Sequence, residues 1–379
     1  MAQIHGTCDE RFIAVRDTLA ANLDSGQDVG ASVAVVLDGR PVVDIFGGVI
    51  DDDGTPWAAD TIINVYSTTK TMVGLTALIL ADRGELDLHA PVSRYWPEFK
   101  AAGKEAIEVC HVLGHTAGLA GWTEPMTAED LYDWDLCCAR LAAQEPWWEP
   151  GTASGYHALT EGYLVGEIVR RITGDTLGTF FAREVARPLG ADFHIGTGAE
   201  HDVRIARVIP PPPLEMPDDP DAFAVRTLAN PRLAAEESWT EQWRRAEIPA
   251  ANGHGNARSV ARVQSALACR GEVDGIRLLS AAGCEAVFEE QAHGVDLVLG
   301  IPVRLGVGYG LNLPELPVSP NPRTCFWGGW GGSLVVVDLD ARLVVSYVMN
   351  RMGEGTTGDM RGAAIVMSTY GALAAAGSG

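Results

Sequence analysis

The chain has few positive charges and no long apolar run. Lysine occurs three times, and lysine plus arginine total 28 against 50 aspartate and glutamate residues, so the formal charge is −22 at pH 7. Nucleic-acid binding needs clustered cations that neutralise phosphates, and anionic lipid surfaces also attract cations. No apolar stretch approaches the roughly 20 residues that a membrane helix needs. The composition therefore argues against nucleic-acid and membrane partners.

The seven cysteines form no recognisable pattern. Their number is odd, no C-x-x-C motif occurs, and two of them are adjacent. Neither a disulfide framework nor a thiolate zinc site is therefore expected, and the thiols are predicted to be reduced and mostly buried. The N-terminal residues lack a basic flank followed by an apolar core, so no signal peptide is visible. These features together predict a cytoplasmic protein.

Apolar periodicity places strands at both ends of the 379-residue chain and helices between them. Strands are expected at residues 31–37, 41–46, 61–65, 334–337 and 343–349. Helices are expected at residues 9–23, 69–81, 156–172, 258–269 and 359–375. The helix at 69–81 is apolar on nearly all sides, which is typical of a helix in the middle of a large protein. The proline-rich stretch 209–231 is interpreted as a long surface excursion.

This order of elements predicts an α+β fold. The simplest architecture is one antiparallel sheet built from both termini and flanked by helices, with an all-helical domain inserted into it. We expect residues 1–82 and 195–379 to form the sheet domain and residues 83–194 to form the helical domain. A cleft between the two domains would be the natural ligand site.

The segment Ser67-Thr-Thr-Lys70, at the start of the helix expected at 69–81, is the first candidate for chemistry. With 14 serines and three lysines, chance would produce about 0.1 S-x-x-K pairs in the chain, so the match is informative. The two side chains share a helix face, and burial would lower the pKa of Lys70 and suit it to proton transfer. The alternative is a plain N-cap serine beside a lysine that reaches solvent.

Two further segments could complete such a site. Tyr156 follows a loop rich in glycine and serine. A nearby buried lysine would lower the pKa of its phenol, which could then act as a base. The run Trp327-Gly328-Gly329-Trp330 leads into the strand expected at 334–337, and its glycines permit close backbone approach to a ligand. The alternatives are a packing tyrosine and a strained turn between two tryptophans.

Together these segments resemble the serine β-lactamase and penicillin-binding-protein superfamily, and within it the family VIII carboxylesterases, which are similar to class C β-lactamases. Residues 84–99, 113–119 and 252–259 look like the same branch, so the resemblance spans about residues 9–349. It implies that Ser67 is the nucleophile and that Lys70 and Tyr156 form the proton-transfer pair. It also implies an oxyanion hole made by the backbone N–H groups of Ser67 and Trp330.

Two residues depart from the lactamase pattern. Trp327 stands where lactamases have the cation of Lys-Thr-Gly or His-Thr-Gly, and an indole cannot pair with a substrate carboxylate. Ala158 stands where they have the asparagine of Tyr-x-Asn. Both departures weaken recognition of β-lactams and peptides, whereas an ester needs only a nucleophile, a base and an oxyanion hole. The sequence therefore predicts a serine carboxylesterase that hydrolyses short-chain esters of small molecules.

Other functions remain open on the same scaffold. They are a β-lactamase, a D-aminopeptidase or amidase, an acyltransferase and, more remotely, a catalytically inactive binding protein. His111 and His115 have a spacing that can bind zinc, but the surrounding glycines favour a loop, so neither a metal nor a cofactor is expected. The residues expected to line the substrate pocket are Trp327, Gly328, Gly329, His157 and Trp122.

Overall fold

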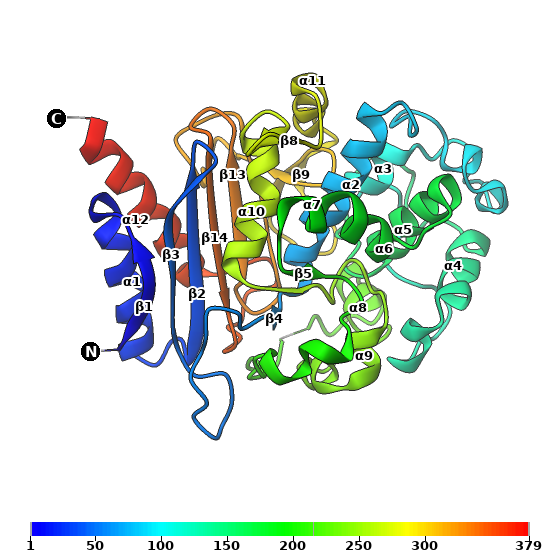
Figure 1. The fold of residues 1–379 in the computed structure, drawn as a ribbon. Helices are drawn as coiled ribbons and strands as arrows, with labels where there is room; N and C mark the ends of the chain where they lie inside the picture. Colours follow the sequence, from blue (N-terminus) through cyan, green and yellow to red (C-terminus); the bar gives the residue numbers. More distant parts are fainter. Residues whose placement is uncertain (1, 215, 378–379) are drawn as a thin grey trace.

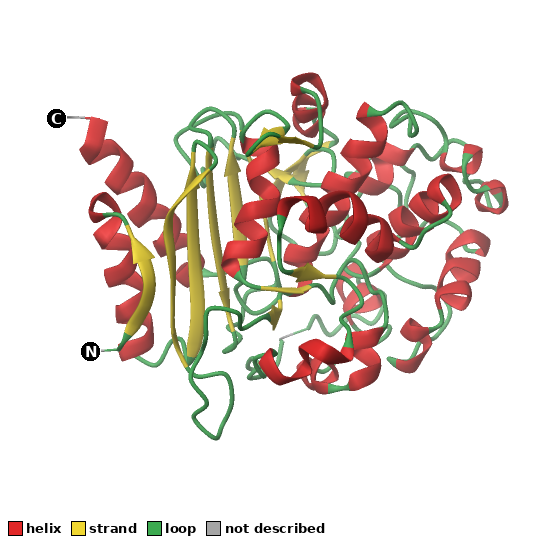
Figure 2. Ribbon diagram, in the orientation of Figure 1, coloured by secondary structure: helices red, strands yellow, loops and turns green. Residues whose placement is uncertain are grey.

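The computed structural model describes residues 2–214 and 216–377. These residues form a nine-stranded antiparallel sheet (Figure 2), whose strands lie in the order β1-β3-β2-β14-β13-β12-β11-β10-β9. Its strands are β1 (Ile4–Cys8), β2 (Gly30–Leu37), β3 (Arg40–Gly48), β9 (Ala292–Val295), β10 (Pro302–Leu305), β11 (Gly310–Leu311), β12 (Thr324–Gly328), β13 (Leu334–Asp338) and β14 (Leu343–Met349). The two ends of the chain therefore meet in the sheet, as the sequence predicted, because β2 pairs with β14.

Helices cover both faces of the central strands (Figure 1). Helix α10 (Ala257–Ala268) packs on β2, β13 and β14, while α1 (Ile13–Asp24) and α12 (Met360–Gly377) pack together on the other face. Strands buried on both faces have continuous apolar sequences rather than alternating ones. This explains why every residue of β13 and β14 is buried.

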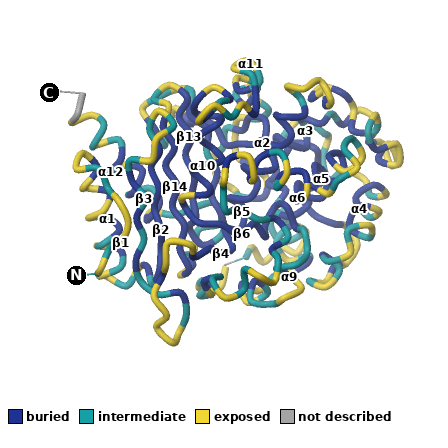
Figure 3. The backbone as a smooth tube through the Cα atoms, viewed as in Figure 1, coloured by how far each residue is buried: buried dark blue, intermediate teal, exposed yellow. Residues whose placement is uncertain are grey.

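The apolar helix predicted at 69–81 is α2 (Lys70–Asp82), which follows a short 3-10 turn, η2 (Tyr66–Thr69). The side chains from Lys70 to Leu80 are all buried, since α2 lies between the sheet and α5 (Thr160–Thr173). Figure 3 shows this interior as one buried region that continues from the sheet into the helices. The helix ends as expected, with Gly84 in the left-handed region at φ +72°.

The remaining helices lie mainly on the side of α2 that faces away from the sheet (Figure 1). They are α3 (Val109–Leu113), α4 (Trp134–Ala143), α6 (Leu177–Phe181), α7 (Arg187–Leu189), α8 (Phe223–Leu228), α9 (Glu241–Arg245) and α11 (Ala281–Glu285). Two small sheets complete the fold, one of β4 (Ile63–Asn64), β6 (His254–Gly255) and β5 (Phe193–His194), the other of β7 (Glu272–Val273) and β8 (Ile276–Arg277). The domain boundaries given above stay a prediction. No helix in the described ranges combines the length and the apolar character needed to cross a membrane.

Several elements differ from the sequence expectation. The helix expected at 156–172 begins only at Thr160, so Tyr156 lies in a loop, although Gly174 ends the helix as predicted. Of the strand expected at 61–65, only β4 forms. The strands β1 and β9–β12 were not predicted, because strands this short show little alternation of apolar and polar residues. The stretch 209–231 is not a simple surface excursion, since it contains α8 and contributes to a cavity wall.

Candidate active site

Ser67 lies in the 3-10 turn between β4 and α2. The preceding residue, Tyr66, has φ +45°, a conformation that non-glycine residues rarely adopt and that is common beside functional groups. The hydroxyl of Tyr66 donates a hydrogen bond to the carbonyl of Ala235 at 3.2 Å, and its ring meets Trp330 edge-on with centroids 5.2 Å apart. These contacts hold the sharp turn that presents the Ser67 hydroxyl.

Lys70 is buried beside Ser67. Its Nζ donates to the backbone carbonyls of Ala158 at 2.7 Å and Ala250 at 3.0 Å, and lies 3.5 Å from Ser67 Oγ. Burial lowers the pKa of Lys70 to about 8, although the buried carboxylate of Glu161 opposes the shift. A substantial fraction of this amine is therefore neutral near pH 8 and able to accept a proton.

Tyr156 completes the group around the Ser67 hydroxyl. Its phenol donates a hydrogen bond of 2.5 Å to Ser67 Oγ, and Lys70 Nζ lies 5.0 Å from the centre of its ring. The expectation of a lowered pKa was wrong, because burial raises the pKa of Tyr156 well above its usual range despite the hydrogen bond to Ser67. In the resting site the phenol is therefore protonated, and Lys70 is the group suited to act as base.

The glycine-rich turn after β12 approaches the Ser67 backbone closely. A Cβ atom at Gly329 would lie 2.3 Å from the carbonyl oxygen of Val65 and 3.2 Å from the amide nitrogen of Ser67, so only glycine fits there. Ser333 ties the same turn to the Ser67 segment, donating to the Val65 carbonyl at 2.8 Å. Neither the Ser67 nor the Trp330 amide has a hydrogen-bond acceptor in residues 2–214 and 216–377, so both remain free to bind an oxyanion.

A cavity of about 670 Å³ opens beside these groups, and Ser67, Tyr156 and Trp330 contribute to its wall. Most of the remaining wall is apolar, and half of its residues come from the proline-rich stretch 209–231, which includes α8. The lining residues other than Ser67, Tyr156 and Trp330 include Pro210, Leu214, Met216, Val225, Leu228, Pro231, Leu233, Trp243 and Ala251. The cavity is large enough for a small-molecule ester.

The five residues that the sequence suggested as pocket lining do not line this cavity. Trp122 is a core residue that packs edge-on against Tyr163 and donates to the Cys137 carbonyl. Gly328 and Gly329 shape the turn rather than the wall. His157 is buried and neutral, because its Nδ1 bonds the Gly155 carbonyl and its Nε2 accepts from the Leu119 amide.

Trp327 is buried and packs against the ring of Tyr156, with the ring centroids 5.5 Å apart. His115 adds a second ring to this stack, 5.3 Å from Tyr156 and 5.7 Å from Trp327. No sequence pattern indicates this role of His115, whose spacing from His111 is typical only of a zinc ligand. The stack fixes the plane of the phenol next to Ser67.

Three acidic or basic residues that the sequence did not indicate lie beside the site. Asp296 is buried, and its Oδ1 accepts from the amides of Tyr156, Val298 and Leu299 at 2.9–3.0 Å. Glu161 is buried near Lys70, and burial raises its pKa to about 7. Arg361 donates to the carbonyl of Gly331 at 2.7 Å, beside Trp330. Single acidic or basic residues carry no periodic pattern, so no sequence signal could have identified them.

Comparison with known proteins agrees with this architecture. The beta-lactamase family model matches residues 15–367. The esterase/beta-lactamase LipL of Mycobacterium tuberculosis is 36% identical over 92% of this chain and 83% of that protein. The crystal structure of a family VIII carboxylesterase is 43% identical, with a TM-score of 0.92 over 98% of this chain and 100% of that one. A penicillin-binding-protein homologue from Caulobacter crescentus is 37% identical, with a TM-score of 0.91 over 98% and 100% of the two chains.

The structure and these relatives define a β-lactamase/transpeptidase-like fold, and the α+β prediction is confirmed. The chain belongs to the beta-lactamase family. It is a hydrolase of the esterase and beta-lactamase group, and the predicted resemblance to family VIII carboxylesterases is confirmed as well.

Proposed function

We propose that this protein is a serine carboxylesterase that forms an acyl-enzyme at Ser67. One observation supports the proposal above all others. At the wall of an apolar cavity, the Ser67 hydroxyl lies 2.5 Å from the Tyr156 phenol and 3.5 Å from the Lys70 amine. A hydroxyl with a base and an acid in contact is the arrangement that nucleophilic catalysis requires.

In the proposed acylation step, neutral Lys70 takes the proton of Ser67 while Oγ attacks the ester carbonyl carbon. The negative charge that develops on the carbonyl oxygen is stabilised by the backbone N–H groups of Ser67 and Trp330. When the tetrahedral intermediate collapses, the carbon–oxygen bond to the alcohol breaks. Tyr156 protonates the departing alkoxide and is reprotonated by Lys70, so the acylation step is balanced.

In deacylation, the same pair activates a water molecule. Water loses one proton to Lys70 and Tyr156 and attacks the acyl carbon, after which the pair returns a proton to Ser67 Oγ as the carboxylic acid leaves. The reaction consumes one ester and one water and releases an acid and an alcohol. No step requires a metal or a cofactor.

The two departures from the lactamase pattern support an ester rather than a β-lactam or peptide. Trp327 is buried against Tyr156, so the position offers no cation to a substrate carboxylate. Ala158 has no side-chain amide, and its backbone carbonyl binds Lys70. Short-chain esters of small molecules remain the predicted substrates, and a cytoplasmic location remains the prediction from the sequence.

Replacing the nucleophile tests the proposal directly. The variant Ser67→Ala should lower kcat/KM for short p-nitrophenyl esters by at least about 10⁴-fold, as removal of a catalytic serine does elsewhere. Circular dichroism and thermal unfolding provide the folding control. A fluorophosphonate probe should add to Ser67 of the unmodified protein, as seen by mass spectrometry. Turnover by Ser67→Ala close to that of the unmodified protein would contradict the assignment.

The same assay separates the alternatives. Turnover of nitrocefin or a D-alanyl anilide above that of p-nitrophenyl esters would favour a β-lactamase or an amidase. Ester products formed with added alcohols in preference to hydrolysis would favour an acyltransferase. A protein that neither reacts with the fluorophosphonate nor turns over any of these substrates would be a binding protein.

A further inference from the structure

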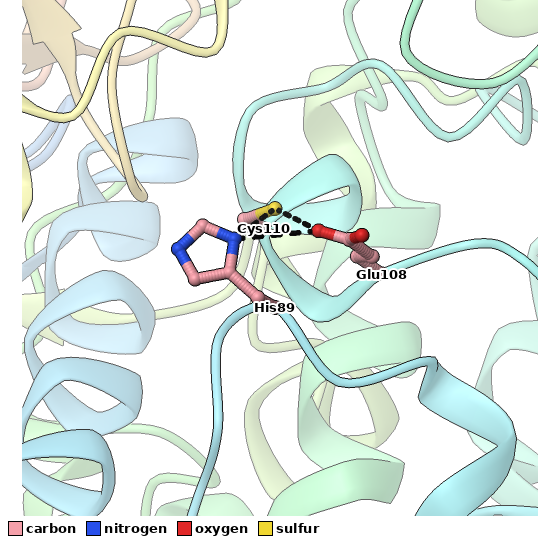
Figure 4. Close-up of side chains that lie close together, drawn as sticks. All are labelled: His89, Glu108 and Cys110. Atoms are coloured by element: carbon pink, nitrogen blue, oxygen red, sulfur yellow. Dashed lines mark hydrogen bonds and ion pairs between the residues drawn. The ribbon is translucent and has the colours of Figure 1, made fainter.

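Three side chains with different metal-binding atoms converge outside the active site (Figure 4). His89 lies in the loop after α2, Glu108 precedes α3, and Cys110 lies in the first turn of α3. His89 Nδ1 is 3.3 Å from Glu108 Oε2, Cys110 Sγ is 3.4 Å from the same oxygen, and Sγ is 3.9 Å from Nδ1. In residues 2–214 and 216–377, this is the one group of three such residues close enough to share a metal ion.

The spacing of these three atoms fits a tetrahedral zinc ion. Zinc binds histidine nitrogen, carboxylate oxygen and thiolate sulfur at about 2.0 to 2.3 Å, which places neighbouring tetrahedral ligands about 3.3 to 3.8 Å apart. The observed separations of 3.3, 3.4 and 3.9 Å therefore need only a small adjustment. One thiolate and one carboxylate also balance the two positive charges of the ion.

A fourth residue orients the histidine. The other ring nitrogen of His89, Nε2, lies 3.3 Å from the carboxylate of Glu289, in the segment before β9. A carboxylate on the second ring nitrogen keeps the proton there, which leaves Nδ1 free to bind a metal. Histidine ligands of zinc commonly have such a partner, so Glu289 supplies evidence beyond the cluster itself.

Backbone hydrogen bonds hold the segments that carry His89, Glu108 and Cys110 together without a metal. The Cys110 amide donates to the carbonyl of Leu88 at 2.8 Å, and Pro91 and Glu108 form an antiparallel bridge. These contacts join the His89 loop to the start of α3, so the ligands are brought together before an ion binds. His89 is accessible, with 58% of its side chain exposed, and offers the ion a path from solvent.

We propose that His89, Glu108 and Cys110 bind one zinc ion, with water as the fourth ligand. When the zinc–sulfur bond forms, the Cys110 thiol proton leaves to solvent. The ion would clamp the His89 loop onto α3, and α3 leads directly to His115, whose ring packs on Tyr156. The site is distinct from Ser67 and does not depend on the proposed esterase activity.

The test uses the full chain, stripped of metal with a chelator and titrated with cobalt(II), which reports thiolate ligation by its near-ultraviolet charge-transfer band. We expect one equivalent to bind and produce the band. His89→Ala and Cys110→Ala should each abolish the band. The matched control is Cys138→Ala, a buried cysteine of α4 that contacts the Tyr163 carbonyl and belongs to no such cluster; it should keep the band.

Zinc itself gives the second measurement. It should raise the thermal unfolding temperature of the stripped protein, but not that of His89→Ala, which changes an accessible loop side chain and therefore folds. Glu289→Gln should weaken zinc binding by about 10- to 100-fold, as loss of an orienting partner does elsewhere. A missing cobalt band, or a band and a zinc-induced stabilisation that persist in His89→Ala, would overturn the proposal.

Discussion

Two of the three lysines of this acidic chain are buried, and they differ in the kind of oxygen that they contact. Lys70 donates to two backbone carbonyls and lies 3.5 Å from the Ser67 hydroxyl. Lys104 donates to three backbone carbonyls, those of Ala101, Ala142 and Gln144. Desolvation lowers the pKa of both amines to about 8.

A shifted pKa therefore does not make a lysine catalytic in this protein. Both amines have lost water and gained carbonyl partners, and both lie near an aromatic ring, Tyr156 for Lys70 and Phe99 for Lys104. The difference is that one partner of Lys70 is the hydroxyl that we propose as nucleophile, whereas the partners of Lys104 are backbone carbonyls, which cannot act as one. Lys104 instead joins the loop that contains Ala101 to the end of α4.

Among the variants that test this difference between the two lysines, removal of Lys70 should have the largest effect. Lys70→Met keeps the length of the side chain and should lower kcat/KM for p-nitrophenyl esters by about 10³- to 10⁴-fold, because the base is lost. Initial rates with p-nitrophenyl butyrate measure it, and Lys104→Met is the matched control. Equal losses of activity in the two variants would show that the contact of Lys70 with Ser67 has no special role.

Tyr156→Phe should have the next largest effect. It removes the phenol that protonates the leaving alkoxide while it keeps the ring in the stack with Trp327 and His115. We expect kcat/KM to fall by about 10²- to 10³-fold with little change in thermal unfolding. Because p-nitrophenolate leaves without a proton, an alkyl ester followed by acid release should show a greater loss than the p-nitrophenyl ester. Equal losses with both esters would contradict a role in leaving-group protonation.

The pH dependence of the reaction should follow Lys70. The amine acts in its neutral form, and its pKa is lowered from 10.5 to about 8. Below pH 8, kcat/KM should therefore fall about tenfold per pH unit, and above pH 8 it should level off. Rates are measured from pH 6 to 9 after subtraction of the Ser67→Ala background. A rate independent of pH across that range would exclude a base of this kind.

The smallest effect on activity is expected from Lys104→Met. The variant leaves three backbone carbonyls without their donor, one of which, that of Ala142, is in a buried contact. The free energy of unfolding should therefore fall by about 1–3 kcal/mol. Its kcat/KM should stay within about twofold of that of the unmodified protein. Urea unfolding followed by fluorescence, together with the ester assay, separates the two quantities. A large loss of kcat/KM in a folded Lys104→Met protein would show that this amine also acts in the reaction.

Much of the proposed catalytic group was predictable from the sequence because the residues concerned are close neighbours along the chain. Ser67 and Lys70 are three residues apart on one helix turn, and rare lysines made the pair conspicuous. The glycines of the turn before Trp330 were also recognisable, because a dense run of them marks close backbone approach. These signals need no knowledge of which distant segments meet.

The supporting residues and the cavity were not predictable in this way. Asp296 holds the backbone of Tyr156 from 140 positions away, and Arg361 reaches Gly331 from α12. The pocket residues proposed from the sequence, such as Trp122, lie in the core instead, while the proline-rich stretch lines the cavity. A burial pattern shows that a side chain is inside, but not whether it faces a cavity or a neighbouring helix.

The amino-acid order alone was sufficient for the class of fold, the buried helix α2 and the pair at its start, because periodicity and short spacing are properties of neighbouring residues. The folded chain alone established that Tyr156 is a protonated phenol, that Lys104 is bound by carbonyls, and that His89, Glu108 and Cys110 converge. Those facts depend on desolvation and on contacts between distant segments, and both arise only when the chain has packed.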